Sequence, residues 1–269
     1  MNLEEAYLRT IAEMKESSAE SLLIRDEIIS CIDLTLLDEN ADDEALNILS
    51  AKATRHQVAA LCVLPQHLKK MPHSNEVKLA TVVNFPEGNQ STEQILSLLK
   101  DLVTTQKIDE IDYVFPYRTY LGGEQQAALL QCQQVYQLCQ QQSLCFKVIL
   151  ETGALPSLES IYQLSTEVLG QGCDFLKTST GKIPQGATPA AAFVLLKAIK
   201  DSGVNCGLKV SGGIKKPEQA FLYANLARLL FKQQVDKSWF RIGASSLLDE
   251  LIQSEQTKPS DLRSVYSIL

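Results

Sequence analysis

Short apolar runs alternate along the chain with longer segments in which apolar residues recur every three or four positions. The short runs are typical of strands buried on both faces, and the three-to-four spacing is typical of amphipathic helices. Segments 91–107 and 187–203 are examples of the helical kind. The predicted strands are residues 30–35, 59–65, 78–85, 110–116, 145–151, 173–179, 206–212 and 239–246.

Eight strand–helix units within 269 residues predict an α/β protein, a single (β/α)8 TIM barrel with an extra N-terminal helix. A doubly wound open sheet is the alternative, and the count of eight favours the barrel. No linker rich in Pro, Gly or Ser divides the sequence, so residues 1–269 are predicted to form one domain.

The two ends of the chain lie outside the strand–helix repeat. Residues 1–27 are predicted as a helical extension, and residues 251–269 as a C-terminal tail. The helix is expected to be amphipathic, and either to extend a subunit interface, as in a homodimer, or to cap the bottom of the barrel. Its apolar residues at helical spacing are Leu3, Tyr7, Leu8, Ile11 and Met14.

Composition narrows the class of protein. Apolar residues make up 45% of the chain, enough for a large core, and the net charge of −7 disfavours a general nucleic-acid surface. The seven cysteines form no CxxC pair, which predicts reduced, buried thiols. The acidic start does not resemble a signal peptide, and no apolar stretch is long enough for a membrane span. We therefore expect a cytoplasmic protein that binds neither nucleic acid nor membrane.

Charged residues occur within the predicted strands, where burial makes an unpaired charge costly. Asp112, Lys147, Lys177 and Lys209 lie in strands four to seven. The carboxyl ends of barrel strands carry the active site in this fold. If Lys177 and Lys209 both point inward, one of the two amines should have a lowered pKa, because like charges repel. A neutral lysine is a nucleophile, and Asp112 could move protons beside it.

The same charges also allow a purely structural interpretation. The lysines could extend along the rim of the barrel, with the aspartate paired to one of them. Two lysines and an aspartate at three strand ends favour the catalytic interpretation.

Glycine-rich turns follow the last three predicted strands: "STG", "SGG" and "GASS". In this fold the loops after strands seven and eight commonly bind phosphate, and Lys182 and Lys215 could add positive charge. The alternative is that glycine only satisfies tight turns. A P-loop is excluded, because the glycine spacing is wrong and Ile183 follows Lys182.

The histidines and Cys62 do not suggest further chemistry. His56, His67 and His73 lack the spacing of metal ligands and are predicted to lie on the surface. Cys62 is predicted to be a packing residue on the second strand.

Taken together, these segments resemble deoxyribose-phosphate aldolase, a family of class I aldolases with a (β/α)8 fold. The resemblance runs from about residue 30 to residue 250 and covers the ends of most strands. It implies reversible cleavage of 2-deoxy-D-ribose 5-phosphate, a sugar phosphate, to D-glyceraldehyde 3-phosphate and acetaldehyde, with no metal or other cofactor. The motifs are "CIDLTLL", "TVVNFPEGN", "EIDYVFPYR", "FKVILETG", "DFLKTSTGK", "LKVSGGIK" and "RIGASSLL".

The resemblance also implies roles for individual residues. Lys177 matches the Schiff-base lysine, Lys209 the second lysine that perturbs it, and Asp112 the aspartate of the proton relay. Asp33 and Thr35 match positions near the sugar hydroxyls. The residues that match the phosphate-binding loops are Gly181, Lys182, Gly212, Gly213, Gly243, Ser245 and Ser246.

In some relatives a tyrosine is the last residue and reaches the site, whereas here Tyr266 is followed by three more residues. Two other functions remain open at this point. One is a Schiff-base aldolase for a different sugar phosphate, and the other is a barrel that binds a sugar phosphate without reacting.

Overall fold

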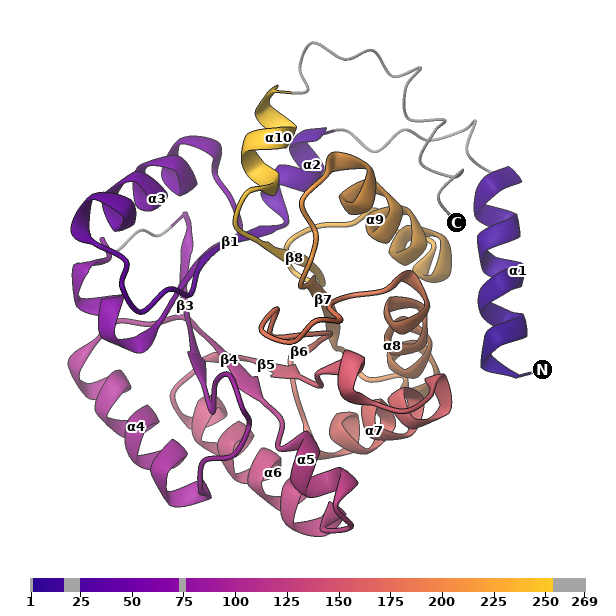
Figure 1. Ribbon diagram of the computed structural model, residues 1–269, viewed down its shortest axis with the longest axis horizontal. Helices are drawn as coiled ribbons and strands as arrows, with labels where there is room; N and C mark the ends of the chain where they lie inside the picture. Colours follow the sequence, from indigo (N-terminus) through magenta and orange to yellow (C-terminus); the bar gives the residue numbers. More distant parts are fainter. Residues whose placement is uncertain (1, 17–24, 73–75, 254–269) are drawn as a thin grey trace.

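Eight parallel strands form a closed barrel in sequence order, as predicted (Figure 1). The structure is a computed structural model that describes residues 2–16, 25–72 and 76–253. The strands are β1 (Ile32–Leu36), β2 (Ala60–Val63), β3 (Lys78–Val83), β4 (Glu110–Val114), β5 (Cys145–Ile149), β6 (Phe175–Lys177), β7 (Gly207–Ser211) and β8 (Phe240–Ala244). The open-sheet alternative is therefore wrong, because β1 pairs with β8 as well as with β2.

Helices surround the barrel (Figure 1). The long ones are α3 (Asp43–His56), α4 (Thr92–Thr105), α6 (Gln125–Gln141), α7 (Leu158–Gln171), α8 (Pro189–Ser202) and α9 (Pro217–Phe231). Shorter elements are α2 (Arg25–Ser30), α5 (Tyr117–Leu121), α10 (Leu247–Gln253) and the 3-10 helices η2 (Pro65–Lys70) and η3 (Thr152–Ala154). None of the helices that the structure describes is both long and apolar enough to cross a membrane.

Side-chain caps fix where several of these helices begin. Ser91 accepts a hydrogen bond from the Gln94 amide, and the Gln94 side chain accepts one from the Ser91 amide, which together form a capping box. Thr188 caps α8 by accepting from the Ala191 amide, and Pro189 follows it at the first helical position. These caps end the βα loops at defined residues, so the loops at the barrel mouth have fixed lengths.

The N-terminal helix α1 (Leu3–Glu16) packs against the outer helices α7, α8 and α9 (Figure 1). Ile11 and Met14 are buried there, and the Tyr7 ring lies 5.7 Å from that of Phe193. The prediction that Leu8 belongs to the packed face is wrong, since 59% of this residue is exposed. The alternative that the helix caps the bottom of the barrel is also wrong, because α1 lies on the helical layer.

Two predicted boundaries differ from the structure. Helix α2 spans residue 27, where the N-terminal extension was expected to end. Residues 251–253 were expected in the C-terminal tail, but they complete α10, and Leu251 is fully buried. Tyr266 and the rest of the predicted tail lie outside the described residues.

Cysteine and histidine placements partly follow the predictions. All seven cysteines are free thiols, and all except Cys145 are buried. The prediction of surface histidines is wrong for His67, which is buried with Nε2 2.9 Å from the Asp38 carbonyl oxygen. His56 is half-buried, and His73 lies outside the described residues.

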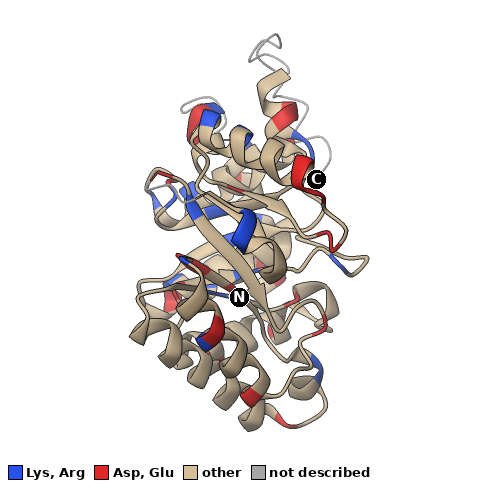
Figure 2. Cartoon of the chain, turned by 90° about the vertical axis from the view of Figure 1, so that its left-hand side faces the viewer, with Lys and Arg blue, Asp and Glu red and all other residues tan. Residues whose placement is uncertain are grey.

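Charged residues lie on the strands inside the barrel (Figure 2). Lys147 Nζ lies 2.5 Å from Glu110 Oε2 and 2.9 Å from Asp112 Oδ1. Arg241 also belongs to this buried layer of charged side chains. Its Nη1 lies 2.7 Å from Asp33 Oδ1 and its Nη2 lies 3.0 Å from Glu110 Oε1. Every one of these groups is buried and paired, which is the condition under which charges are tolerated inside a protein.

We predict that Lys147→Met lowers the free energy of unfolding by about 3–5 kcal/mol, because it leaves the Glu110 and Asp112 carboxylates buried with one cation fewer. Lys78→Met is the matched control, since Lys78 forms a half-exposed pair with Asp109 at 3.4 Å. It should cost about 0–1 kcal/mol. Urea unfolding followed by circular dichroism measures both, and equal losses would contradict the role of the buried layer.

Candidate active site

The strand register brings the two predicted lysines together. Lys177, the last residue of β6, is the direct partner of Lys209 on β7. Asp112 on β4 pairs in the same way with Lys147 on β5. All four side chains are almost completely buried, so they point into the barrel and away from the rim. The interpretation that Lys177 and Lys209 extend along the rim is therefore wrong.

One carboxylate oxygen joins the two lysines. Lys177 Nζ donates to Asp112 Oδ2 at 2.6 Å, and Lys209 Nζ donates to the same oxygen at 2.7 Å. Lys209 Nζ also donates to Asp33 Oδ2 at 2.5 Å. Within the described residues Lys177 therefore pairs with one carboxylate, Asp112, whereas Lys209 lies between two.

This difference sets the two lysine pKa values apart. Burial lowers the pKa of Lys177, and the positive charge of Lys209 lowers it further, so that the attraction of Asp112 does not restore the ordinary value. Burial also disfavours the charged form of Lys209, but the Asp112 and Asp33 carboxylates outweigh it and raise the pKa of Lys209. Lys177 is thus the amine that loses its proton more readily. The neighbouring cation, expected from the sequence to cause this shift, contributes less to it than burial does.

Asp112 stays ionised in this surrounding. Burial would raise its pKa, but Lys147, Lys177 and Lys209 hold the pKa of Asp112 well below the usual range. A carboxylate that contacts the more acidic lysine can accept a proton during a reaction at that lysine.

Cys62 on β2 lies near this cluster without taking part in it. It packs with the apolar side chains of Ala60, Leu64, Ala80 and Val82. Burial raises the pKa of the Cys62 thiol to about 11, so the reactive thiolate is disfavoured.

The glycine-rich turns after β6 and β7 touch each other. Gly181, with φ +78°, is placed so that a Cβ there would lie 3.6 Å from the Gly212 Cα. Gly212 and Gly213 also adopt positive φ angles, which side chains on L-residues disfavour. The two turns therefore lie against each other at the carboxyl ends of β6 and β7.

The turn after β8 lies beside the buried lysine Lys209. A Cβ at Gly243 would lie 3.1 Å from Lys209 Cε, so this glycine leaves space for the buried lysine. Ser245 and Ser246 are exposed and directly precede α10. The three predicted turns thus lie at the carboxyl ends of neighbouring strands.

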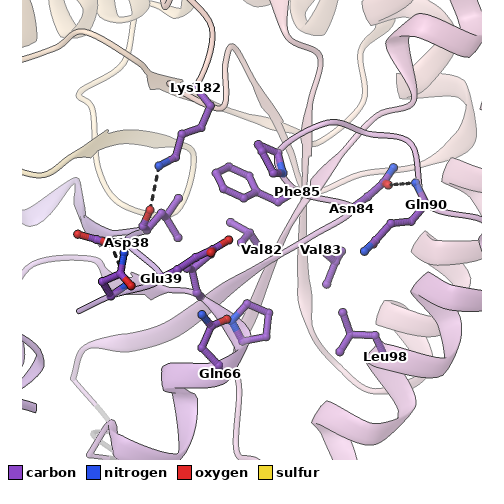
Figure 3. A pocket seen from close by; sticks show the side chains of 15 residues that line it. Asp38, Glu39, Gln66, Val82, Val83, Asn84, Phe85, Gln90, Leu98 and Lys182 are labelled. Atoms are coloured by element: carbon purple, nitrogen blue, oxygen red, sulfur yellow. Dashed lines mark hydrogen bonds between the residues drawn. The ribbon is translucent and has the colours of Figure 1, made fainter. Parts of the chain in front are cut away.

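Lys182 extends from the β6–α8 loop across the barrel mouth (Figure 3). Its Nζ donates to the Leu37 carbonyl oxygen at 2.9 Å, which ties this loop to the loop after β1. Both lie at a hollow of about 590 Å³ between the ends of β1, β2 and β3. Lys182 is exposed, so its amine can reach a ligand in the mouth of the barrel.

The two remaining predicted residues have partners inside the protein. Thr35 Oγ1 donates to the Asp33 carbonyl oxygen at 2.8 Å. Asp33 is fully buried, and its two carboxylate oxygens contact Lys209 and Arg241.

The sequence pattern identified Lys147 as a charged residue within a strand but indicated no role for it. The pattern did not identify Glu110, Arg241 or Glu151. The spacing of Glu110 and Asp112 was an available signal, because residues two apart in a strand face the same side.

Among residues 2–16, 25–72 and 76–253, no group of three His, Cys, Asp or Glu side chains is arranged to hold a metal ion.

Solved structures with the same fold include several aldolases. A protein from Coccidioides immitis, proposed to be a deoxyribose-phosphate aldolase, superposes with a TM-score of 0.76 at 23% identity, over 94% of this chain and 98% of that one. A deoxyribose phosphate aldolase from Aeropyrum pernix, described as a unique tetramer, has a TM-score of 0.72 at 23% identity, over 93% and 98% of the two chains. At this identity the likeness establishes the barrel fold.

A family comparison extends the result from fold to chemistry. Residues 27–249 match the model of the DeoC/LacD family aldolases. The matched range contains all eight strands, the buried lysines and the glycine-rich turns. The chain therefore belongs to the DeoC/LacD family of aldolases.

Proposed function

We propose that the protein is a class I aldolase that reversibly cleaves 2-deoxy-D-ribose 5-phosphate to D-glyceraldehyde 3-phosphate and acetaldehyde through a Schiff base on Lys177. The observation that carries the proposal is the buried Lys177 amine with a lowered pKa, in contact with an ionised carboxylate. A neutral amine attacks a carbonyl carbon, whereas an ammonium group does not.

The proposed reaction begins at C1 of the open-chain sugar. The Lys177 nitrogen bonds to C1, and loss of water from the carbinolamine gives an iminium ion. The electrons of the C2–C3 bond then move toward the iminium nitrogen and form an enamine, while the C3 hydroxyl loses its proton and becomes the aldehyde of glyceraldehyde 3-phosphate. Protonation of the enamine at C2 and hydrolysis release acetaldehyde and regenerate Lys177. Asp112 is the proposed group that accepts and returns the protons.

The charges of the barrel interior support a neutral Lys177 at the start. The buried cluster has three carboxylates and four basic side chains, so it is electrically balanced when one basic group is neutral. Lys177 is the one whose pKa is lowered. The iminium ion that forms on its nitrogen is positive, and Asp112 is the carboxylate in contact with that position.

The turns after β6, β7 and β8 support the phosphate part of the proposal. Gly181, Gly212 and Gly213 expose backbone amides, and the Lys182 amine reaches the same mouth. Ser179 Oγ, beside Gly212, is buried without a hydrogen-bond partner in the described part of the chain. A phosphate group bound here would place the sugar between the turns and Lys177.

The cellular setting follows from the proposed reaction. We infer that the enzyme acts in the cytoplasm in the breakdown of deoxyribose phosphate derived from deoxyribonucleotides. A homodimer remains a prediction from the sequence.

We predict that the wild-type protein releases glyceraldehyde 3-phosphate from deoxyribose 5-phosphate and that Lys177→Met abolishes this activity. A coupled glyceraldehyde-phosphate dehydrogenase assay measures the release. Treatment with acetaldehyde and borohydride should add one ethyl group to the wild-type protein, detected by mass spectrometry and located on Lys177 by peptide mapping.

Lys197→Met is the control, because Lys197 forms a half-exposed pair with Asp201 on an outer helix. It should keep both turnover and trapping. Retention of the ethyl group by Lys177→Met would contradict the assignment of the nucleophile, and absence of turnover in a wild-type protein that is trapped normally would contradict the assigned substrate.

We predict that Lys209→Met moves the pH profile of trapping to higher pH. Loss of the neighbouring positive charge leaves Asp112 as the main charge near Lys177, so the pKa of Lys177 rises and less free amine is present at neutral pH. A shift on the order of one pH unit is expected, with about a tenfold slower reaction at neutral pH.

The rate of borohydride trapping with acetaldehyde between pH 6 and 10 measures this shift, and circular dichroism checks that the variant folds. An unchanged midpoint in a folded variant would remove Lys209 from the mechanism.

A further inference from the structure

Glu151 has an unusual backbone conformation at the carboxyl end of the barrel. It lies two residues after β5, is fully buried, and has φ 53° and ψ 59°, in the left-handed region. Three of the other non-glycine residues with positive φ lie at the ends of helices, where this conformation is common: Gln57, Ser143 and Lys232. The left-handed region is sparsely populated by residues other than glycine, so a glutamate at a strand end keeps this conformation only where its surroundings hold it.

The Glu151 carboxylate is held by one residue of the β6–α8 loop. Thr180 Oγ1 donates to Glu151 Oε2 at 2.5 Å, and the Thr180 amide lies 3.3 Å from Oε1 and 3.4 Å from Oε2. Thr180 Oγ1 in turn accepts a hydrogen bond from the Lys182 amide at 3.0 Å. A continuous chain of hydrogen bonds therefore runs from Glu151 through Thr180 to Lys182, across Gly181.

The two residues after Glu151 lie against the same loop. The Thr152 amide donates to the Thr178 carbonyl oxygen at 2.8 Å. A Cβ at Gly153 would lie 2.2 Å from the Gln185 carbonyl oxygen, so only glycine fits there. Residues 151–153 thus support the loop at three points along its length.

On the other side the loop rests on the turn after β7. The Ala187 amide lies 3.1 Å from the carbonyl oxygens of both Ser211 and Gly212, and a Cβ at Gly186 would clash with Gly212. The loop is therefore enclosed between two neighbouring turns, and the carboxylate of Glu151 is its charged contact on the β5 side.

We propose that Glu151 is a positioning residue, which holds the 180–182 turn in the shape that receives the phosphate of the substrate. The inference rests on the function proposed above. Glu151 acts through Thr180, whose hydroxyl donates to the Glu151 carboxylate and accepts from the Lys182 amide, and this fixes the turn around Gly181. The negative charge of the Glu151 side chain matters as well as its size and shape, because the carboxylate accepts hydrogen bonds from both the hydroxyl and the amide of Thr180.

The charge environment agrees with this geometry. Burial raises the pKa of Glu151, while the Thr180 hydrogen bonds and the charges of Lys177 and Arg118 oppose the rise. A buried carboxylate with such partners is usually maintained for a specific contact.

The test compares Glu151→Gln with Glu159→Gln, a matched change at an exposed residue early in α7. Steady-state kinetics are measured with deoxyribose 5-phosphate and with unphosphorylated deoxyribose. Glu151→Gln should raise KM for the phosphorylated substrate about tenfold, lower its kcat much less, and weaken discrimination between the two sugars. Glu159→Gln should change neither substrate's constants.

A second pair covers the case in which Glu151→Gln does not fold. Thr180→Val removes the hydroxyl that links Glu151 to Lys182 and should show the same rise in KM, whereas Thr180→Ser keeps the hydroxyl and should restore most of the discrimination.

Borohydride trapping with acetaldehyde, which has no phosphate, separates this inference from the proposed function. Failure of trapping in the wild-type protein would reject the Schiff-base mechanism itself. Normal wild-type trapping, together with equal losses for both sugars in Glu151→Gln or in Thr180→Val, would overturn the positioning role alone.

Discussion

The contact of one aspartate with several lysines governs the interior of this barrel. Asp112 Oδ2 accepts hydrogen bonds from Lys177 and Lys209, and Oδ1 accepts one from Lys147. Without this carboxylate Lys147 and Lys209 would keep one carboxylate partner each, Glu110 and Asp33, whereas Lys177 would lose the carboxylate with which it pairs. Because Lys209 has Asp33 as a second partner and Lys177 has no second carboxylate within the described residues, the shared aspartate leaves Lys177 as the more easily deprotonated amine.

Closure of the barrel makes that contact achievable. The strands pair in sequence order, so side chains from β4, β6 and β7 converge on one axis although they are far apart in the chain. The same closure places the turns after β6 and β7 against each other at the mouth. The buried charges and the glycine turns are therefore two parts of one arrangement, the charges inside the barrel and the turns above them at its mouth.

Much of the fold follows from the sequence pattern, because eight apolar runs separated by amphipathic segments admit few architectures. The convergence of Lys177, Lys209 and Asp112 was also predictable, since the carboxyl ends of barrel strands meet at one mouth and charge is costly to bury there without a partner. The spacing of Glu110 and Asp112 placed both on one face of β4, but the pairing of Glu110 with Arg241 was not predictable, because it depends on which residues face each other across a closed barrel. The exposure of Leu8 was missed because helical spacing identifies the apolar face of a helix but not the surface that this face packs against. The burial of His67 was missed because a short helix can bury a polar ring when one backbone carbonyl forms a hydrogen bond with it.

The ion pair between Arg241 and Asp33 has a consequence for biosynthesis. Its partners lie 208 positions apart, on the last and the first strand of the barrel. As the chain leaves the ribosome, Asp33 and Glu110 emerge long before the guanidinium group that neutralises them. The early strands thus carry carboxylates that are unfavourable to bury alone, and their cationic partners on β5, β7 and β8 are all synthesised later.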